Sequence, residues 1–168
     1  AKFKDNFLFC LFSETSLLGP LRGTPQGLKF VINACVQNAA KQHFKNLPLQ
    51  THSKHNYQMS FKALGLAPYI LRSIVKQEYK LPTPIQEQAI PVILKGKDVL
   101  GIAPTGSGKT AAYALPIIQN LEGKTTTKNR HISVLVLVPT RELAVQVEEV
   151  FRSFTHELPF RLKSMAVH

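Results

Sequence analysis

The chain has 168 residues, of which 44% are hydrophobic and 18% charged, and its formal net charge is +11 at pH 7. Its length suits one domain, or one domain with a tail, and its hydrophobic content is sufficient for a packed core. No apolar run approaches the ~18 residues of a membrane-spanning helix, which argues against a membrane protein. The positive charge favours an anionic partner such as nucleic acid.

Residues 1–58 show no clear periodicity, and we interpret them as an N-terminal extension or linker. The apolar residues 7–12 resemble a signal-peptide core, but the stretch is short and no small-residue cleavage site follows. Residues 28–35 are compatible with a short strand or a short helix. The polar, basic segment 41–57 has the composition of a linker, which we favour over a metal site because its histidines match no ligand spacing. These histidines are His43, His52 and His55.

Regular patterning begins at Phe61. We expect a helix that starts near Pro68, because proline suits the first helical turn and the following apolar residues are spaced to form one face. These residues are Ile70, Leu71, Ile74 and Val75. A second helix is expected from Pro84 to about Leu94, with a kink or an early break at Pro91.

The rest of the chain alternates between predicted strands and helices. We expect strands at 98–103, 132–138 and 162–167, and helices at 109–120 and 141–155. The second of these helices has four apolar residues spaced to face a core: Leu143, Val147, Val150 and Phe154. Such alternation predicts an α/β fold with right-handed crossovers and a parallel sheet covered on both faces. Ligands of such sheets bind at the carboxyl ends of the strands.

A phosphate-binding loop falls at such an end, in residues 103–110. Its sequence is Ala103, Pro104, Thr105, Gly106, Ser107, Gly108, Lys109 and Thr110. Glycines let successive N–H groups point at phosphate oxygens, Lys109 can reach the β- and γ-phosphates, and the Thr110 hydroxyl can ligate Mg²⁺. Ala103 replaces the usual first glycine. A glycine-rich turn without a phosphate role is the alternative, which the flanking strand and helix disfavour.

Two further stretches suggest ligand contacts. The amide of Gln86 can donate and accept in a planar pair, as adenine N6 and N7 require, although it can also cap its helix. Pro139, Thr140 and Arg141 open the helix after the second strand, where N–H groups and a guanidinium suit a polynucleotide phosphate. An ordinary charged first turn is the alternative reading, and Glu142 is assigned no ligand role because an acid there suits the helix dipole.

The cysteines point to the compartment. Cys10 and Cys35 lack the C-x-x-C spacing of metal and redox motifs, and a nucleotide-binding domain implies a reducing cytosol. We therefore expect free thiols and a cytoplasmic location, with one disulfide as the alternative.

Taken together, these residues resemble the first RecA-like domain of DEAD-box RNA helicases. The loop A-x-T-G-S-G-K-T is that family's variant, residues 82–86 look like its Q motif, and residues 139–146 are similar to its motif Ia. The resemblance covers residues 59–168, which would form part of a RecA-like, P-loop NTPase domain. It implies ATP, Mg²⁺ and RNA as ligands. It implies that Phe61 stacks on adenine. The sequence looks closest to the RhlE-like group, and Glu78, where the family usually has glycine, is expected to alter a turn.

Hydrolysis needs more than a phosphate cradle, because a carboxylate must hold the Mg²⁺ and an arginine usually faces the γ-phosphate. The only aspartates are Asp5 and Asp98, both upstream of the loop. The resemblance implies that the Asp-Glu-Ala-Asp box, the Ser-Ala-Thr motif and the second RecA-like domain lie beyond His168. Two functions stay open. The chain is part of an ATP-dependent RNA helicase, or it is a truncated nucleotide- or RNA-binding fragment without turnover.

Overall fold

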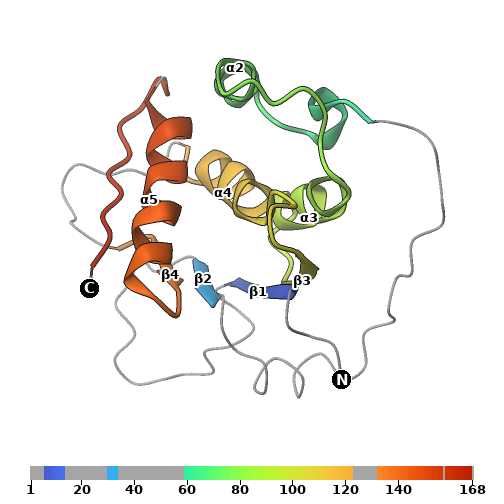
Figure 1. The fold of residues 1–168 in the computed structure, drawn as a ribbon. Helices are drawn as coiled ribbons and strands as arrows, with labels where there is room; N and C mark the ends of the chain where they lie inside the picture. Colours follow the sequence, from blue (N-terminus) through green and yellow to red (C-terminus); the bar gives the residue numbers. More distant parts are fainter. Residues whose placement is uncertain (1–5, 14–29, 34–58, 123–131, 157, 168) are drawn as a thin grey trace.

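A computed structural model describes residues 6–13, 30–33, 59–122, 132–156 and 158–167. The histidines of the predicted linker and Cys35 lie outside the described residues. Helices gather on one side of a four-stranded sheet (Figure 1). Among the described helices, none has the length and apolar character that crossing a membrane requires.

The sheet has the order β3-β1-β2-β4. Its strands are β1 (Asn6–Ser13), β2 (Phe30–Asn33), β3 (Val99–Pro104) and β4 (Val134–Leu137). β1 runs antiparallel to both β2 and β3, whereas β2 and β4 are parallel. β3 and β4 therefore run in the same direction, as the predicted crossover requires, but two strands from the N-terminal segment separate them. The predicted parallel direction of the strands at 98–103 and 132–138 is confirmed, whereas β1, which was not predicted as a strand, is antiparallel to its neighbours. Residues 28–35 contain a strand rather than a helix.

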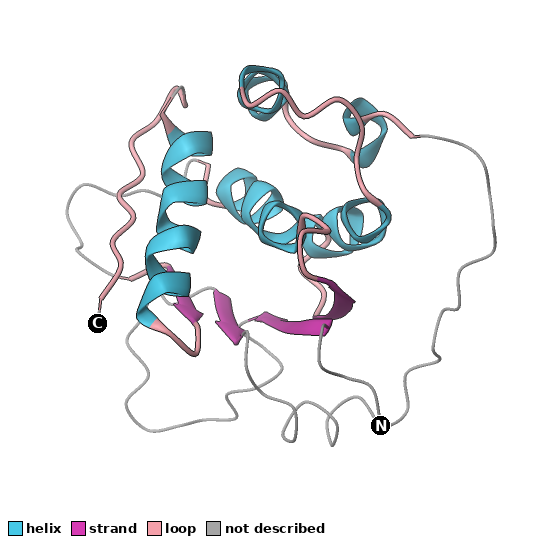
Figure 2. Ribbon diagram, viewed as in Figure 1, coloured by secondary structure: helices cyan, strands magenta, loops and turns pink. Residues whose placement is uncertain are grey.

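In the described residues, five helical segments accompany these strands, and Figure 2 draws the helices in cyan. They are the 3-10 helix η1 (Phe61–Leu64) and the α-helices α2 (Pro68–Lys76), α3 (Pro84–Leu94), α4 (Lys109–Asn120) and α5 (Arg141–Thr155). The four predicted α-helices are confirmed, and α3 runs without a break through Pro91. On α2, however, Val75 is 73% exposed, and the buried face consists of Tyr69, Ile70, Ser73 and Ile74.

Helix α4 forms the centre of the core. Every residue from 111 to 118 is buried. One apolar cluster joins α4 to α3 through Ala89 and Ile93, and a second joins it to η1, α2 and α5 through Phe61, Ile70 and Phe154. Because α4 begins directly after the predicted phosphate loop, this packing fixes the direction in which the loop opens.

Polar contacts fasten the far end of α4 to the start of α2. The side-chain oxygen of Gln119 accepts a hydrogen bond from the Ala67 N–H (2.7 Å), and its nitrogen donates to the Gly65 carbonyl (3.1 Å). The Tyr69 hydroxyl donates to a Glu122 carboxylate oxygen (2.8 Å). The bond from Ala67 satisfies the N-cap N–H of α2, which the helix itself leaves unpaired.

The predicted third strand at 162–167 does not form. Residues 158–167 are an extended segment beside α5 (Figure 1). Leu162 packs against the apolar clusters, and the Ser164 hydroxyl donates to the Glu148 carboxylate (3.1 Å). This segment therefore contacts α5 through side chains and does not form the backbone hydrogen bonds of the expected strand.

The described helices cover one face of the sheet (Figure 1). Val134 and Val136 of β4 pack against the core cluster, whereas Leu135 and Leu137 are 38% and 43% exposed. On β3, Ile102 is 51% exposed between two buried neighbours. The alternating pattern predicted helices on both faces of the sheet, but the described helices cover only one.

Glu78 adopts the left-handed conformation, with φ of 59°, directly after the C-cap of α2. Its N–H donates to the Val75 carbonyl (3.0 Å), and the Tyr79 N–H donates to the Ile74 carbonyl (3.1 Å). This is the helix-ending geometry that glycine favours. The turn is thus formed with the conformation of a glycine, and the glutamate occupies it at a steric cost.

Replacing Glu78 with glycine should therefore raise the free energy of unfolding. We expect a gain of about 0.5–1 kcal/mol, because relief of the left-handed strain exceeds the entropy that glycine adds to the unfolded chain. Urea titration followed by circular dichroism measures it. Gln77→Gly is the matched control, since its φ of −85° suits any residue, and it should lower stability. Equal effects of the two variants would contradict strain at Glu78.

Candidate nucleotide and nucleic-acid site

The predicted phosphate loop connects the end of β3 to the start of α4. Gly106 and Gly108 have φ of 76° and 81°, a conformation that other residues rarely adopt. A Cβ on Gly106 would meet nothing within 4 Å, so that glycine is needed for its backbone conformation alone. A Cβ on Gly108 would collide with the side-chain nitrogen of Gln86. Gly108 is thus required by both conformation and space.

The N-terminus of α4 has the features of an anion-binding site. Gly108 is its N-cap and supplies no side chain to cap the helix. The N–H groups of the first turn have no partners within a helix, and the helix dipole adds partial positive charge there. A phosphate is the ligand that such a terminus favours.

Lys109 is held by the loop itself. Its ammonium donates to the carbonyl oxygen of Ala103 (2.7 Å) and to that of Pro104. Partial burial lowers the pKa of Lys109. The ammonium therefore lies beside the start of the loop, next to the helix terminus that attracts anions.

Two hydroxyl groups belong to the same loop and helix turn. Within the part of the chain that the structure describes, the Ser107 hydroxyl is buried and has no hydrogen-bond partner. Thr110 is half-buried in the first turn of α4 and contacts the hydroxyl of Tyr113. Burial raises the pKa of Tyr113 to about 12, and the hydrogen bond with Thr110 opposes that rise. Hydroxyl oxygens can ligate Mg²⁺, and hydroxyl groups can donate hydrogen bonds to phosphate.

The side chain of Gln86 is completely buried and joins α3 to the loop. Its oxygen accepts from the Thr83 N–H (3.0 Å), and its nitrogen donates to the Gly108 carbonyl (3.1 Å). The Thr83 hydroxyl donates to the Ser107 carbonyl (2.9 Å). Sequence reasoning had not identified Thr83, although its place before Pro84, at the N-cap of α3, was a usable signal. Contact of Gln86 with adenine stays a prediction.

Phe61 lies in the core rather than at an open surface. It is 5% exposed, and its ring packs edge-on against Tyr79 with centroids 6.4 Å apart. It comes from η1, whereas the phosphate loop follows β3. The stacking of adenine on Phe61 stays a prediction, and it requires more of the ring to be uncovered.

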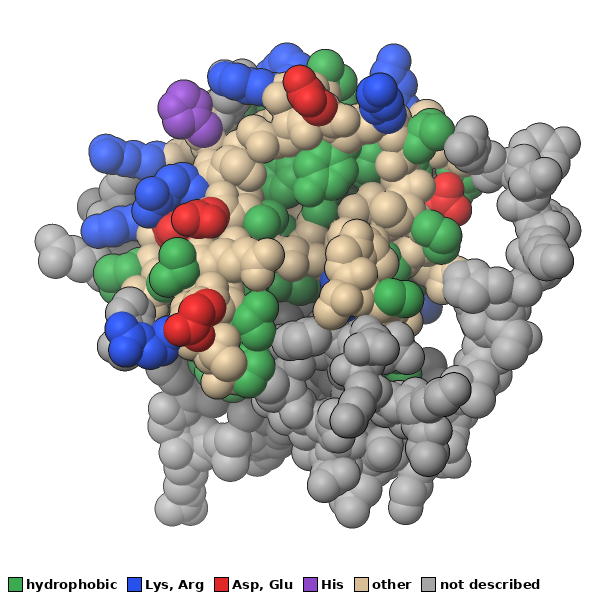
Figure 3. Space-filling view, viewed as in Figure 1, with side chains coloured by type: hydrophobic (Ala, Val, Ile, Leu, Met, Phe, Trp, Pro, Cys, Tyr) green, Lys and Arg blue, Asp and Glu red, His purple; other side chains and the backbone are tan. Residues whose placement is uncertain are grey.

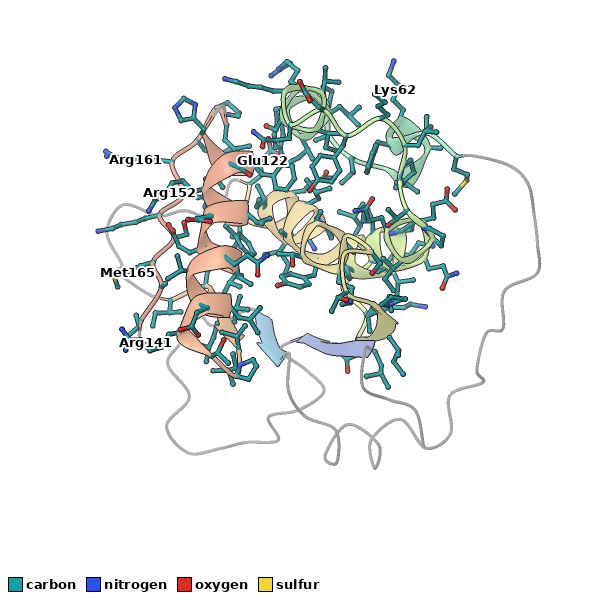
Figure 4. The ribbon with its side chains drawn as sticks, in the orientation of Figure 1. Lys62, Glu122, Arg141, Arg152, Arg161 and Met165 are labelled. Atoms are coloured by element: carbon teal, nitrogen blue, oxygen red, sulfur yellow. The ribbon has the colours of Figure 1, made fainter. Side chains whose placement is uncertain are left out.

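Pro139, Thr140 and Arg141 are exposed at the start of α5, directly after β4. Thr140 is the N-cap, and its hydroxyl accepts from the Leu143 N–H (3.3 Å). Because β3 and β4 are parallel, these residues lie at the same edge of the sheet as the phosphate loop. Figure 4 shows Arg141 at the β4 end of α5.

Basic side chains continue along α5. Arg141, Arg152 and Arg161 lie along this helix and the segment that follows it (Figure 4). Figure 3 shows lysine and arginine side chains scattered over the same side of the molecule, with acidic ones between them. Arg152 forms an i,i+4 pair with Glu148 at 2.9 Å. The pair partly neutralises the charge in the middle of this side, whereas Arg141 lies at the start of α5.

The described residues bring no aspartate to the phosphate loop. Asp98 precedes β3 and is therefore at the opposite end of that strand from the loop. Nor do three or more histidine, cysteine, aspartate or glutamate side chains gather into a metal site in the described ranges. This part of the chain has the features of a binding site and lacks the acid that phosphoryl transfer needs.

Comparison with known proteins agrees with this geometry. The family model described as DEAD/DEAH box helicase matches residues 83–167. The chain is 50% identical over 98 residues to the ATP-dependent RNA helicase DeaD of Buchnera aphidicola subsp. Schizaphis graminum, which covers 58% of this chain and 16% of that protein. It is 44% identical over 124 residues to the DEAD-box ATP-dependent RNA helicase RhpA of Helicobacter pylori strain B128, covering 73% and 23% respectively.

A solved structure is similar as well. The crystal structure of the RNA-helicase Prp28 from Chaetomium thermophilum, bound to ADP, superposes with a TM-score of 0.59 at 38% identity, over 68% of this chain and 28% of that one. The chain thus spans a quarter or less of the two curated relatives, and its α/β fold is an incomplete RecA-like, P-loop domain. Since the family match takes in 85 of the 168 residues, including the phosphate loop and the start of α5, the chain belongs to the DEAD/DEAH box helicase family.

Proposed function

We propose that this chain supplies the ATP-binding part of an ATP-dependent RNA helicase. The observation that carries the proposal is the loop at 103–110, in which two glycines of positive φ lead from a strand end into the uncapped N-terminus of a buried helix. That backbone directs N–H groups at an anion of the size of a phosphate. The name ATP-dependent RNA helicase is carried by both curated relatives described above.

The residues around the loop fit Mg²⁺ and a nucleotide triphosphate. The N–H groups at the start of α4 would hold the β- and γ-phosphates, and the ammonium of Lys109 would neutralise them after exchanging its carbonyl partners. Thr110 would supply a hydroxyl oxygen to Mg²⁺, which organises the phosphate oxygens when bound. The unpartnered hydroxyl of Ser107 supports this fit, because a buried polar atom without a partner is rare.

Gln86 would recognise adenine while keeping its tie to the loop. One N–H of its amide donates to the Gly108 carbonyl, so the second N–H and one lone pair of the oxygen are left for a base. Phe61 would stack on the ring only if its packing against Tyr79 opened. Gln86 and Phe61 are 0% and 5% exposed, so a base would reach either side chain only after local opening around it.

The start of α5 would contact the RNA backbone. Thr140 and Arg141 are exposed there and share the sheet edge with the phosphate loop, so nucleotide and RNA would lie side by side. Contacts of this kind position a strand without reading its sequence. Pro139 would direct the chain into the helix terminus.

Hydrolysis would require groups from a second RecA-like domain and from the acidic box of the first. A chain that binds both ligands without turnover is the alternative, and the lack of an aspartate at the loop among the described residues favours it. RNA-stimulated ATP hydrolysis that disappears in Lys109→Ala would contradict it. A cytoplasmic location and membership of the RhlE-like group stay predictions.

Lys109→Ala should weaken ATP binding by about ten-fold or more, because it removes a charge-assisted contact to phosphate. Fluorescence anisotropy of a labelled ATP analogue measures the Kd. Lys95→Ala is the control, since that lysine is exposed at the C-cap of α3 and should leave the Kd unchanged. Equal Kd values for Lys109→Ala and the unmodified chain would contradict the proposed phosphate site.

Gln86→Ala should reduce the preference for ATP over GTP by roughly five-fold or more, since the lost amide contact is specific to adenine. Competition of each nucleotide against the labelled analogue gives the ratio. Thr83→Ala is the matched control: it removes the bond to the Ser107 carbonyl and should weaken ATP and GTP alike. If both variants keep the original ratio, Gln86 holds the loop and does not read the base.

Arg141→Ala should weaken the binding of single-stranded RNA and lower the salt dependence of the binding constant by about 0.7 in logarithmic slope, as the loss of one phosphate contact requires. Binding of oligouridine at several salt concentrations measures both effects. Arg152→Ala is the control, because its guanidinium already pairs with Glu148. A slope change of the same size in Arg152→Ala would place the RNA contact along α5 and not at its start.

A further inference from the structure

We propose that a groove between α2 and the last turns of α5 binds an acidic amphipathic helix of another protein. The groove combines apolar side chains that the core covers only in part with basic side chains beside them. It lies away from the phosphate loop and from the start of α5, and it does not depend on the proposed function.

Two neighbouring hollows form this groove. The first lies on the outer face of α2 and is lined by Leu71, Arg72, Val75 and Lys76. The second is lined by the end of α2 and the end of α5, through Lys76, Gln77, Glu149, Arg152, Ser153 and His156. Because Lys76 lines both hollows, they form one groove. The two helices that border it also pack against each other in the core cluster around Phe154.

The outer face of α2 presents a row of apolar side chains. Leu71 is half-buried and Val75 is 73% exposed, although the opposite face of the helix already places Ile70 and Ile74 in the core. Since Leu71 and Val75 are four residues apart, they are neighbours on one side of the helix. Of the exposed large hydrophobic residues on the described helices, Val75 has the largest exposed fraction. Such a row matches the i, i+4 apolar residues with which an amphipathic helix binds to a groove.

Basic side chains run beside this apolar row. Arg72 and Lys76 are exposed, again four residues apart, and α2 contains no acidic residue. Arg152 adds a guanidinium from α5, whereas Glu149 is the one acid among the described residues that line the groove. Figure 3 shows basic side chains around the α2 end of the molecule. Carboxylates flanking the apolar row of a partner helix would complement this charge, which favours association and specificity.

The same properties disfavour two other occupants. RNA would bring phosphates to the basic side chains, but the described residues that line the groove include no aromatic ring on which a base could stack. The apolar row would also have no role in binding a phosphate backbone. A second copy of the chain carries the same net charge of +11, and a symmetric contact would bring the basic side chains of both copies together. An acidic helix has neither disadvantage.

The groove is separate from the proposed RNA contact. It reaches α5 between Glu149 and the C-cap, whereas Thr140 and Arg141 are at the start of that helix. At a rise of 1.5 Å per residue, Arg141 and Arg152 are about 17 Å apart along the helix axis. A partner helix about 10 Å across therefore has room at one end of α5 while RNA is bound at the other.

Designed peptides test the chemistry of the groove in the full chain. The probe is a fluorescein-labelled helical peptide of about fifteen residues, with leucines at i, i+4 and i+8 and glutamates on both sides of that row. One control peptide has lysine in place of each glutamate. The other has the same composition in an order that scatters the leucines. Fluorescence anisotropy should show that the glutamate peptide binds about ten-fold more tightly than either control.

Substitutions in α2 should locate the binding. Arg72→Glu and Val75→Ser should each weaken binding of the glutamate peptide about five-fold or more, because they remove charge and apolar contact from the groove. Lys95→Glu makes the same change of charge at the exposed C-cap of α3, and Val167→Ser makes the same change of side chain at a residue that is 78% exposed. These two controls should leave the Kd unchanged. Circular dichroism should show equal helical content in all four variants, since the four side chains are exposed.

Several outcomes would overturn the proposal. These are equal binding of the three peptides, no binding of the glutamate peptide at about 1 mM, or an equal loss of affinity in the control variants. A larger loss of oligouridine affinity in Arg72→Glu than in Lys95→Glu would assign the groove to RNA. A dimer that Val75→Ser dissociates in sedimentation experiments would assign it to a second copy. If the chain bound the glutamate peptide selectively but not the labelled ATP analogue, the proposed function would fail and the groove proposal would stand.

Discussion

The hydrogen bond from the buried Gln86 amide to the Gly108 carbonyl is the contact on which the site depends. It joins the start of α3 to Gly108, the N-cap of α4, and the Thr83 hydroxyl adds a second bond to the neighbouring Ser107 carbonyl. Because Gln86 is fully buried, breaking the bond would leave a polar group without water, which costs more than the bond itself contributes. Gln86 is therefore required to hold the loop in place, and it is also a candidate for base recognition.

Helix α4 transmits this constraint to the rest of the domain. Its first turn belongs to the ligand site, its middle is buried against α3, α2 and α5, and its last turn fastens α2 through Gln119. A displacement of the loop along the helix axis would have to move these contacts together. Packed interiors resist such adjustments, so the loop is held close to one geometry before any ligand arrives. The start of α5 is also held in position, because Phe154 of the same helix belongs to the core around α4.

The sequence predicted the loop and the helices well because their signals are local. Pro84 marks the first residue of α3, and the run from Lys109 to Asn120 carries the composition of a helix behind a glycine-rich turn. The strands predicted at 98–103 and 132–138 formed, but the pairing with β1 and β2 was not predicted. Pairing is not local: Phe7 and Ala103 are partners 96 residues apart, and no pattern near either one reveals the other or the antiparallel direction of β1. Residues 162–167 alternate as a strand would, yet Leu162 and Ser164 use that alternation to contact other parts of the core and α5. Glu78 shows the converse, since its positive φ was indicated only by the glycine that the resembled family has there and not by the glutamate itself.

Because Lys109 already donates to two carbonyl oxygens, binding of a phosphate would replace these hydrogen bonds and would not simply add new ones. An incoming phosphate must compete with the oxygens of Ala103 and Pro104 for the same ammonium protons. The net gain is the difference between two sets of contacts, and it grows with the number of phosphate oxygens that reach the lysine. On the proposed function, a ligand that places several phosphate oxygens near the lysine would compensate for the lost carbonyl contacts better than a ligand with a single distant phosphate. The two backbone oxygens would then favour ligands with longer phosphate chains, independently of how the base is recognised.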